Sequence, residues 1–164
     1  MEPVDPRLAS AVKEEILRNV VRTHAAVMVE GWSGTGKTVT ALKSSSGIGA
    51  AYYYSESAAS PGIPVEQYSE GVVRVADLET LPDLDGAEDR PSVVIVDDLD
   101  EMAAGSKRML AALVAKKAAH RKIILITPVA LDEKELFPLM DAVVRFKQHT
   151  AEMLFTARDG PSGS

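Results

Sequence analysis

Several short runs of the chain have three or four consecutive apolar residues at their centre, and stretches with helical or turn-like patterns separate them. The continuous runs are AVMVE (26–30), SVVIVD (92–97) and KIILIT (122–127). Strands that are apolar throughout are typical of the centre of a parallel sheet, where helices cover both faces. AAYYYS (50–55) and GVVRVA (71–76) predict two further strands.

Helical spacing is clearest near the N-terminus. Within 5–23, Leu8, Val12, Ile16 and Val20 recur at intervals that would place them on one helix face. Further helices are predicted at 38–45, at 132–137 behind an Asp132 cap, and at 106–120, with Ser106 as N-cap and Met109, Leu110, Leu113 and Val114 pointing inward.

The C-terminal part of the chain predicts a different strand arrangement. DAVVRF (141–146) and AEMLFTAR (151–158) are joined by the polar turn KQHT, which favours an antiparallel pair. The alternation of strands and helices before this pair predicts a three-layer α/β fold with a mostly parallel central sheet flanked by helices. We expect a single domain over 1–164, with an N-terminal helix in 1–24 and a flexible tail at 159–164.

Composition narrows the cellular setting. Hydrophobic residues make up 46% of the chain and charged residues 26%, and there is no cysteine. These values are typical of soluble globular proteins, and the apolar runs are too short to span a bilayer. The N-terminus lacks the pattern of a secretory signal, so we expect a cytoplasmic protein without membrane insertion. The net charge of −6 disfavours a surface that follows nucleic acid throughout, and leaves a local nucleic-acid site as the less favoured interpretation.

The strongest chemical signal is GWSGTGKT at 31–38. It matches the phosphate-loop pattern G-x-x-x-x-G-K-T/S, and it follows a predicted strand and opens a predicted helix, as that pattern requires. Glycines let backbone N–H groups surround phosphate oxygens, while the lysine reaches the β- and γ-phosphates. The predicted nucleotide-binding residues are Gly31, Trp32, Ser33, Gly34, Thr35, Gly36, Lys37, Thr38 and Val39.

A second signal lies at the end of SVVIVD. Asp97 ends an apolar strand, where its carboxylate would point from the carboxyl edge of the sheet toward the glycine loop. Magnesium prefers such oxygen ligands, and the Thr38 hydroxyl is the usual partner. The sequence therefore predicts a Mg²⁺ site at Thr38 and Asp97, serving a bound nucleotide. No NKxD guanine-reading motif occurs in the chain, which favours ATP and ADP over guanine nucleotides.

With these motifs in this order, residues 24–160 resemble the RecA superfamily of ATPases, most of all its KaiC/RadA branch. The resemblance implies ATP hydrolysis that drives or switches an assembly, with Lys37 at the phosphates. It also implies that the acid after the second strand, Glu56, polarises the attacking water. Arg158 matches an arginine that reaches the nucleotide of a neighbouring subunit in such assemblies, although Thr156 replaces the lysine that normally precedes it.

Alternatives remain open on the sequence alone. In an AAA+ ATPase the acid directly after the Walker-B aspartate is the base, which would assign that role to Asp98. A non-catalytic ATP-dependent switch subunit and a small phosphotransferase are further alternatives. The short acidic connections EMAAG and PVALDEKELFP disfavour a DNA-recombinase, whose corresponding loops are long. A homo-oligomer or an assembly with a partner protein is the expected context.

Overall fold

One sheet organises the chain, which we describe from a computed structural model over residues 6–156. Its seven strands have the order β3-β2-β4-β5-β1-β6-β7. All neighbouring strands are parallel except β6 and β7, which pair antiparallel. The predicted α/β class, the mostly parallel sheet and the antiparallel C-terminal pair are confirmed. The strands are β1 (Ala26–Gly31), β2 (Ala50–Ser55), β3 (Val73–Arg74), β4 (Ser92–Asp97), β5 (Arg121–Thr127), β6 (Ala142–Phe146) and β7 (Ala151–Thr156).

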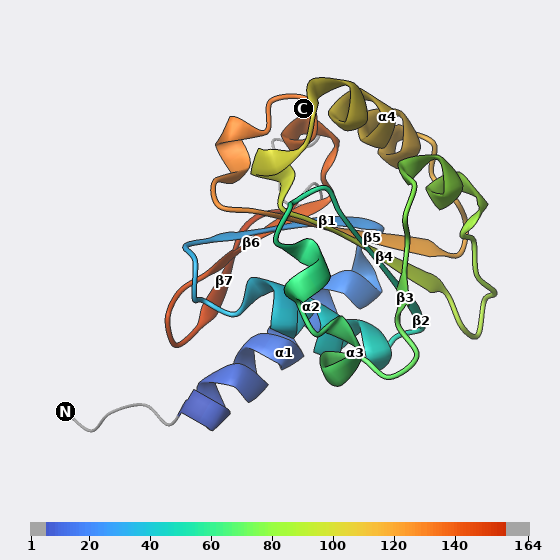
Figure 1. Cartoon of the computed structure of the whole chain (residues 1–164). Coiled ribbons are helices and arrows are strands. Elements are labelled where there is room, and N and C mark those ends of the chain that lie inside the picture. Colours follow the sequence, from blue (N-terminus) through green and yellow to red (C-terminus); the bar gives the residue numbers. More distant parts are fainter. Residues whose placement is uncertain (1–5, 157–164) are drawn as a thin grey trace, which may run out of the picture.

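Helices cover both faces of this sheet (Figure 1). Three helices lie on one face and one on the other, which gives three layers. The helices are α1 (Pro6–Thr23), α2 (Lys37–Ser46), α3 (Val65–Tyr68) and, on the opposite face, α4 (Ala104–Ala115). Short 3-10 turns complete the connections: η1 (Ser60–Gly62), η2 (Leu78–Asp83), η3 (Leu99–Glu101), η4 (Ala130–Asp132) and η5 (Phe137–Leu139).

The layers enclose a hydrophobic core on each side of the sheet. Because successive strand residues point to opposite faces, Val27 and Val29 of β1 join the core under α1 and α2, whereas Met28 joins the core under α4. Tyr53 and Tyr54 of β2 divide in the same way. Continuous apolar runs therefore serve both cores at once, as the sequence pattern predicts.

The buried face of α1 agrees with the predicted row at Ile16 and Val20 and differs from it nearer the N-terminus. Leu8 and Val12 are 62% and 40% exposed, whereas Lys13 and Leu17 are buried. The helix packs against α2 and the β6–β7 pair, and Leu17 and Val20 join the core on this side of the sheet, with Ile16 packed against it. A lysine consequently lies inside the fold.

Local boundaries near α4 also differ from expectation. The helix begins at Ala104, so Ser106 lies inside it and is not its N-cap, and Met109 is 44% exposed rather than inward. The segment 132–137 forms no α-helix. Its Glu133 is buried and pairs with Lys107 of α4 at 2.8 Å, which draws this segment onto the neighbouring helix. The predicted strand at 71–76 shortens to β3, an edge strand with a single neighbour.

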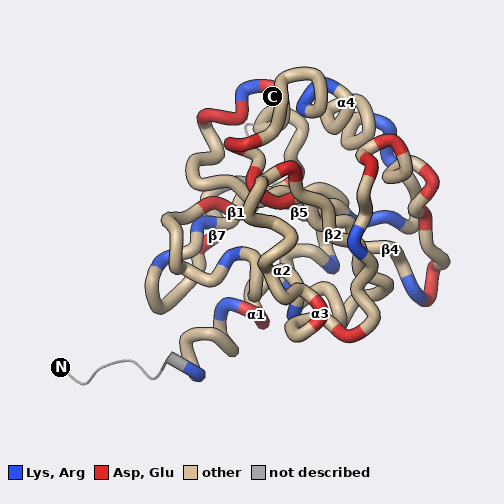
Figure 2. Tube along the Cα trace, in the orientation of Figure 1, with Lys and Arg blue, Asp and Glu red and all other residues tan. Residues whose placement is uncertain are grey.

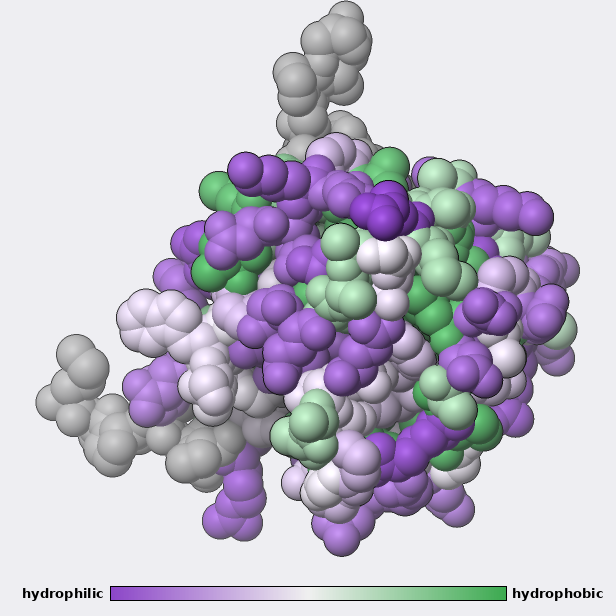
Figure 3. All heavy atoms as spheres, turned by 45° about the horizontal axis from the view of Figure 1, so that its top comes forward, coloured by the Kyte–Doolittle hydropathy of each residue, from purple (hydrophilic) through white to green (hydrophobic). Residues whose placement is uncertain are grey.

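Surface properties of the described residues are mixed. No helix within residues 6–156 is long and apolar enough to cross a membrane. Lys and Arg are interspersed with Asp and Glu along the trace in Figure 2. The face shown in Figure 3 is mostly hydrophilic, with small separate hydrophobic areas.

Candidate functional site

The loop between β1 and α2 needs glycine at three positions. Gly34 and Gly36 have φ angles of 85° and 84°, in the left-handed region that strains other residues. At Gly31 a Cβ atom would lie 2.8 Å from the Phe146 carbonyl oxygen, because β6 passes directly beside the start of the loop. These glycines let the chain turn tightly and enter α2 with its first N–H groups exposed.

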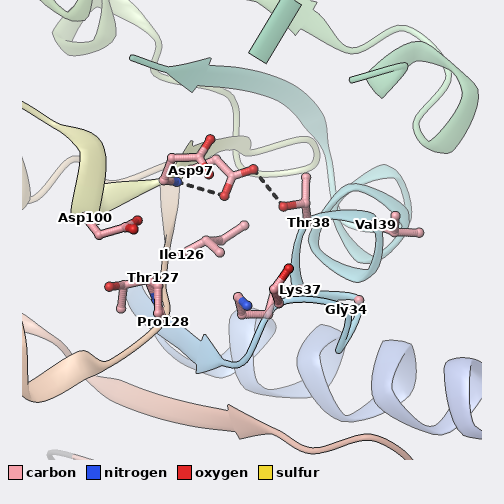
Figure 4. A pocket seen from close by; sticks show the side chains of 12 residues that line it. Gly34, Lys37, Thr38, Val39, Asp97, Asp100, Ile126, Thr127 and Pro128 are labelled. Atoms are coloured by element: carbon pink, nitrogen blue, oxygen red, sulfur yellow. Dashed lines mark hydrogen bonds between the residues drawn. The ribbon is translucent and has the colours of Figure 1, made fainter. Parts of the chain in front are cut away.

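A cavity of about 410 Å³ opens over this loop, at the carboxyl ends of the parallel strands. Glycine-loop and α2 residues form one side, and residues at and just after the carboxyl ends of β4 and β5 form the other (Figure 4). Its lining residues are Ser33, Gly34, Gly36, Lys37, Thr38, Val39, Asp97, Asp98, Asp100, Ile126, Thr127 and Pro128. The structure therefore brings the glycine loop and the acidic end of β4 together around one space.

Thr38 and Asp97 meet across this cavity. The Thr38 hydroxyl donates a hydrogen bond to Asp97 Oδ2 at 2.7 Å, and the Tyr53 hydroxyl donates to the same oxygen at 2.7 Å. The other carboxylate oxygen accepts the Asp98 backbone N–H at 2.8 Å. Asp97 is only 2% exposed. These bonds fix the carboxylate in a single orientation beside the first turn of α2.

Lys37 is folded back onto its own loop. Its Nζ donates to the Gly31 carbonyl at 2.6 Å and to the Trp32 carbonyl at 2.9 Å. Burial lowers the pKa of this ammonium, although the nearby carboxylates of Asp97, Asp100 and Asp98 oppose the shift. The cation therefore lies at the loop, and its present hydrogen bonds are to neutral carbonyl oxygens.

Asp98 lines the cavity in an unusual backbone conformation. With φ 54° and ψ 49°, it is the only non-glycine residue with positive φ in the described part of the chain. Its Oδ2 accepts a hydrogen bond from the Ser55 hydroxyl at 2.6 Å. Burial raises the pKa of the Asp98 carboxyl, and neighbouring acids add to the shift while the Ser55 bond opposes it. A residue in a sparsely populated backbone conformation, held there by hydrogen bonds with the residues around it, is a recurrent feature of functional sites.

Glu56 occupies a different environment. Its carboxylate accepts hydrogen bonds from the Tyr54 hydroxyl at 2.5 Å and from the Ala103 N–H, just before α4, at 3.1 Å. Burial raises the pKa of Glu56, but hydrogen bonds from Ser106, Tyr54 and Ala103 outweigh it and lower the pKa overall. It is not among the residues that line the cavity. Of the two acids considered as base, the structure brings only Asp98 to the site.

A second cavity, of about 700 Å³, continues from the first on the β6 side of the loop. The two share Ser33, Gly34 and Pro128. Trp32, which is 83% exposed, lines this second cavity. The apolar side chains of Val129 and Phe146 line it as well. The polar residues in its wall include Glu30 and Arg145, which form a 2.6 Å ion pair. Arg158 lies outside the described residues.

The donor set at Thr38 and Asp97 fits a magnesium ion. A hydroxyl and a carboxylate are hard oxygen ligands, and Mg²⁺ characteristically takes one or two protein ligands and completes its shell with water and substrate phosphates. Within residues 6–156 no group of three or more Asp, Glu, His or Cys side chains is arranged to hold a metal. Thr38 and Asp97 thus supply two oxygen groups of the kind that Mg²⁺ takes as ligands.

Sequence reasoning missed the side chains that orient the site. The Tyr53 hydroxyl donates a hydrogen bond to Asp97 Oδ2. Strand alternation predicts that Tyr53 lies on the α2 side of the sheet, but it does not predict that Tyr53 reaches this oxygen. Lys13 donates to the Thr35 carbonyl of the loop, and nothing in the helical pattern marked it.

A scan against protein-family models finds no match for this chain, and a search of curated proteins finds no similar sequence.

Proposed function

We propose that this domain binds Mg-ATP and hydrolyses it. The observation that carries the proposal is the 2.7 Å hydrogen bond from Thr38 to Asp97, which joins the start of α2 to the end of β4 inside one cavity. A glycine turn of purely structural use has no need of a buried carboxylate at this position. A phosphate loop with its metal ligands requires both groups together.

The loop supplies the positive potential for the phosphates. The N–H groups at the start of α2 and the helix dipole favour an anion there. Lys37 is half-buried at the loop, so its charge interacts with a bound phosphate with little screening. On binding, we expect its Nζ to exchange the Gly31 and Trp32 carbonyls for the stronger charged acceptors of the β- and γ-phosphates.

Thr38 and Asp97 would hold the magnesium ion, which when bound neutralises charge on the phosphates. In that role Thr38 would contribute its hydroxyl oxygen and Asp97 would contribute its carboxylate. Tyr53 donates a hydrogen bond to the same carboxylate oxygen. The three side chains thus prepare the position before the nucleotide arrives.

Asp98 is the proposed base. Its carboxylate lines the cavity, and Ser55 fixes its orientation. A water oxygen attacks the γ-phosphorus, the bond from that phosphorus to the β–γ bridging oxygen breaks, ADP leaves, and the water proton passes to Asp98. Glu56, assigned this role by the resemblance, is engaged with the start of α4 instead.

The second cavity is the proposed position of the nucleoside. It begins where the phosphate cavity ends, and its wall combines the exposed Trp32 ring and Phe146 with the polar Glu30 and Arg145. Apolar walls with a few polar groups are typical of such binding sites. Stacking of the base on Trp32 is the expected contact.

Phosphate release from Mg-ATP tests the proposal. Wild type should release phosphate, Lys37→Ala should lose nucleotide binding, and Asp98→Asn should bind normally with turnover reduced by about 100-fold or more. Folding of each variant is checked by circular dichroism. An absence of ATP binding in the folded wild type, measured by calorimetry, refutes the proposal.

A non-hydrolysing nucleotide switch is the second candidate. One observation favours it. The Glu56 carboxylate accepts a hydrogen bond from the Ala103 N–H at 3.1 Å, so the acid to which the resemblance assigns catalysis does not lie at the cavity. If the domain is such a switch, wild type binds ATP and Lys37→Ala loses this binding, but wild type releases no phosphate.

A further inference from the structure

Lys13 is a buried cation between α1 and the glycine loop. The Lys13 side chain is 5% exposed, although the residue before it in the same helix, Val12, faces solvent. Its Nζ donates to the Thr35 carbonyl at 2.8 Å and to the Gln148 carbonyl at 2.9 Å. The ammonium also lies 5.6 Å from the centroid of the Phe146 ring. One side chain of α1 thus ties the loop to the turn between β6 and β7.

Burying this charge has an energetic cost that simple packing would not require. Burial lowers the pKa of the Lys13 ammonium, because removal from water disfavours the charged form. A methionine or leucine would fill the same space without desolvating a charge. The hydrogen bonds to the two carbonyls are what the lysine adds.

The bond to Thr35 fixes the orientation of a peptide in the loop. The Thr35–Gly36 peptide is planar and trans, so its carbonyl and its N–H point in opposite directions. With the carbonyl held on Lys13, the Gly36 N–H faces away from α1. Gly36 lines the phosphate cavity, whereas Thr35 does not. The peptide therefore presents a donor on the cavity side.

This peptide could easily take the opposite orientation without the lysine. Glycine occupies positive and negative φ with similar ease, so the residue after the peptide does not resist a flip. A flipped peptide would turn the Thr35 carbonyl oxygen toward the phosphates and remove a donor. The loop would then repel the anion that it has to bind.

We propose that Lys13 is a positioning residue for phosphate binding, which acts by holding the Thr35–Gly36 peptide with its N–H toward the cavity. This inference rests on the proposed function, because it specifies how the same loop is set for a phosphate. Through Gln148 the same ammonium couples the loop to the β6–β7 turn. Lys13 contacts the loop from the α1 side and takes no part in the chemical step.

Binding of Mg-ATP and of inorganic pyrophosphate to Lys13→Met, measured by calorimetry, tests this role. Methionine keeps the length and apolar bulk and removes both hydrogen bonds, and we expect both ligands to bind about tenfold or more weakly. Lys13→Arg, which keeps a cation with several donors, should recover most of the affinity. Lys134→Met is the matched control, because Lys134 is exposed and outside both cavities.

The Gly36 amide provides a readout that a merely structural lysine would not change. Its NMR resonance should shift on adding pyrophosphate to wild type and Lys13→Arg, and should shift far less in folded Lys13→Met. Equal affinities and equal Gly36 shifts in wild type and Lys13→Met overturn the inference and leave the proposed function standing. If wild type binds neither ligand, the proposed function fails and this inference fails with it.

Discussion

Replacing Glu56 by glutamine separates a helix-anchoring role from a catalytic one. The carboxylate accepts from the Tyr54 hydroxyl at 2.5 Å and from the Ala103 N–H at 3.1 Å, at the start of the 12-residue helix α4. Glutamine removes the charge and turns one acceptor oxygen into an amino group, which cannot accept either hydrogen. We therefore expect Glu56→Gln to destabilise the fold and to leave catalysis nearly intact.

The size of the effect follows from these contacts. A negative charge at a helix N-terminus contributes about 0.3–1 kcal/mol, and a hydrogen bond to a charged group about 1.5–3 kcal/mol when well buried. Glu56 is partly exposed, so solvent screening reduces both contributions. A loss of about 1–2 kcal/mol in the free energy of unfolding is expected, with a fall of about 2–4 °C in Tm per kcal/mol for a domain of this size.

Two assays on the same protein preparations give the answer. Urea unfolding and thermal melts measure stability, and phosphate release from saturating Mg-ATP measures turnover. Glu70→Gln, at an exposed acid after α3, is the control for the loss of one charge. Turnover in Glu56→Gln should stay within about threefold of wild type, whereas Asp98→Asn loses about 100-fold. Loss of turnover in Glu56→Gln with unchanged stability and unchanged ATP affinity would refute the assignment of the base to Asp98.

Further predictions concern the loop, the surface ring and the pH dependence of stability. Gly31→Ala should weaken Mg-ATP binding in calorimetry and destabilise the fold by about 1–3 kcal/mol, because its Cβ would lie 2.8 Å from the Phe146 carbonyl oxygen. Trp32, the only tryptophan, should change its fluorescence on titration with Mg-ATP, and a flat titration would contradict the proposed nucleoside position. Burial, aided by the bond to Glu56, raises the pKa of the Tyr54 phenol, so the folded chain keeps a proton that the unfolded chain loses. Stability measured by urea unfolding should therefore fall as pH rises above about 10, and should fall less steeply in Tyr54→Phe.

The sequence predicted the sheet well because its central strands depend on local information. Residues 93–96 are apolar at each position, and few environments other than a doubly covered strand bury such a run. The turn chemistry of the glycine loop is equally local, since the φ angles of Gly34 and Gly36 are set within a few residues. The position of Asp97 at the end of its strand followed from the same reasoning.

Other features depended on contacts between segments far apart in the chain. The inward face of α1 shifted toward Lys13 and Leu17 because α2 and the β6–β7 pair determine which side is covered. The start of α4 is held by Glu56, an acid 47 residues earlier, so no local cap was needed at Ser106. Periodicity cannot reveal which neighbour a helix will meet.

The sequence by itself determined the fold class, the strand succession and the phosphate-loop pattern, because each depends on the spacing of residues near one another. Only the tertiary structure decided which acid reaches the cavity: β2 and β4 are adjacent, yet Glu56 turns to α4 while Asp98 turns into the site. It also decided that Lys13 supports the loop across 22 residues of chain. A side chain's direction is set by whichever donors and acceptors surround it, and these come from segments that the linear order does not bring together.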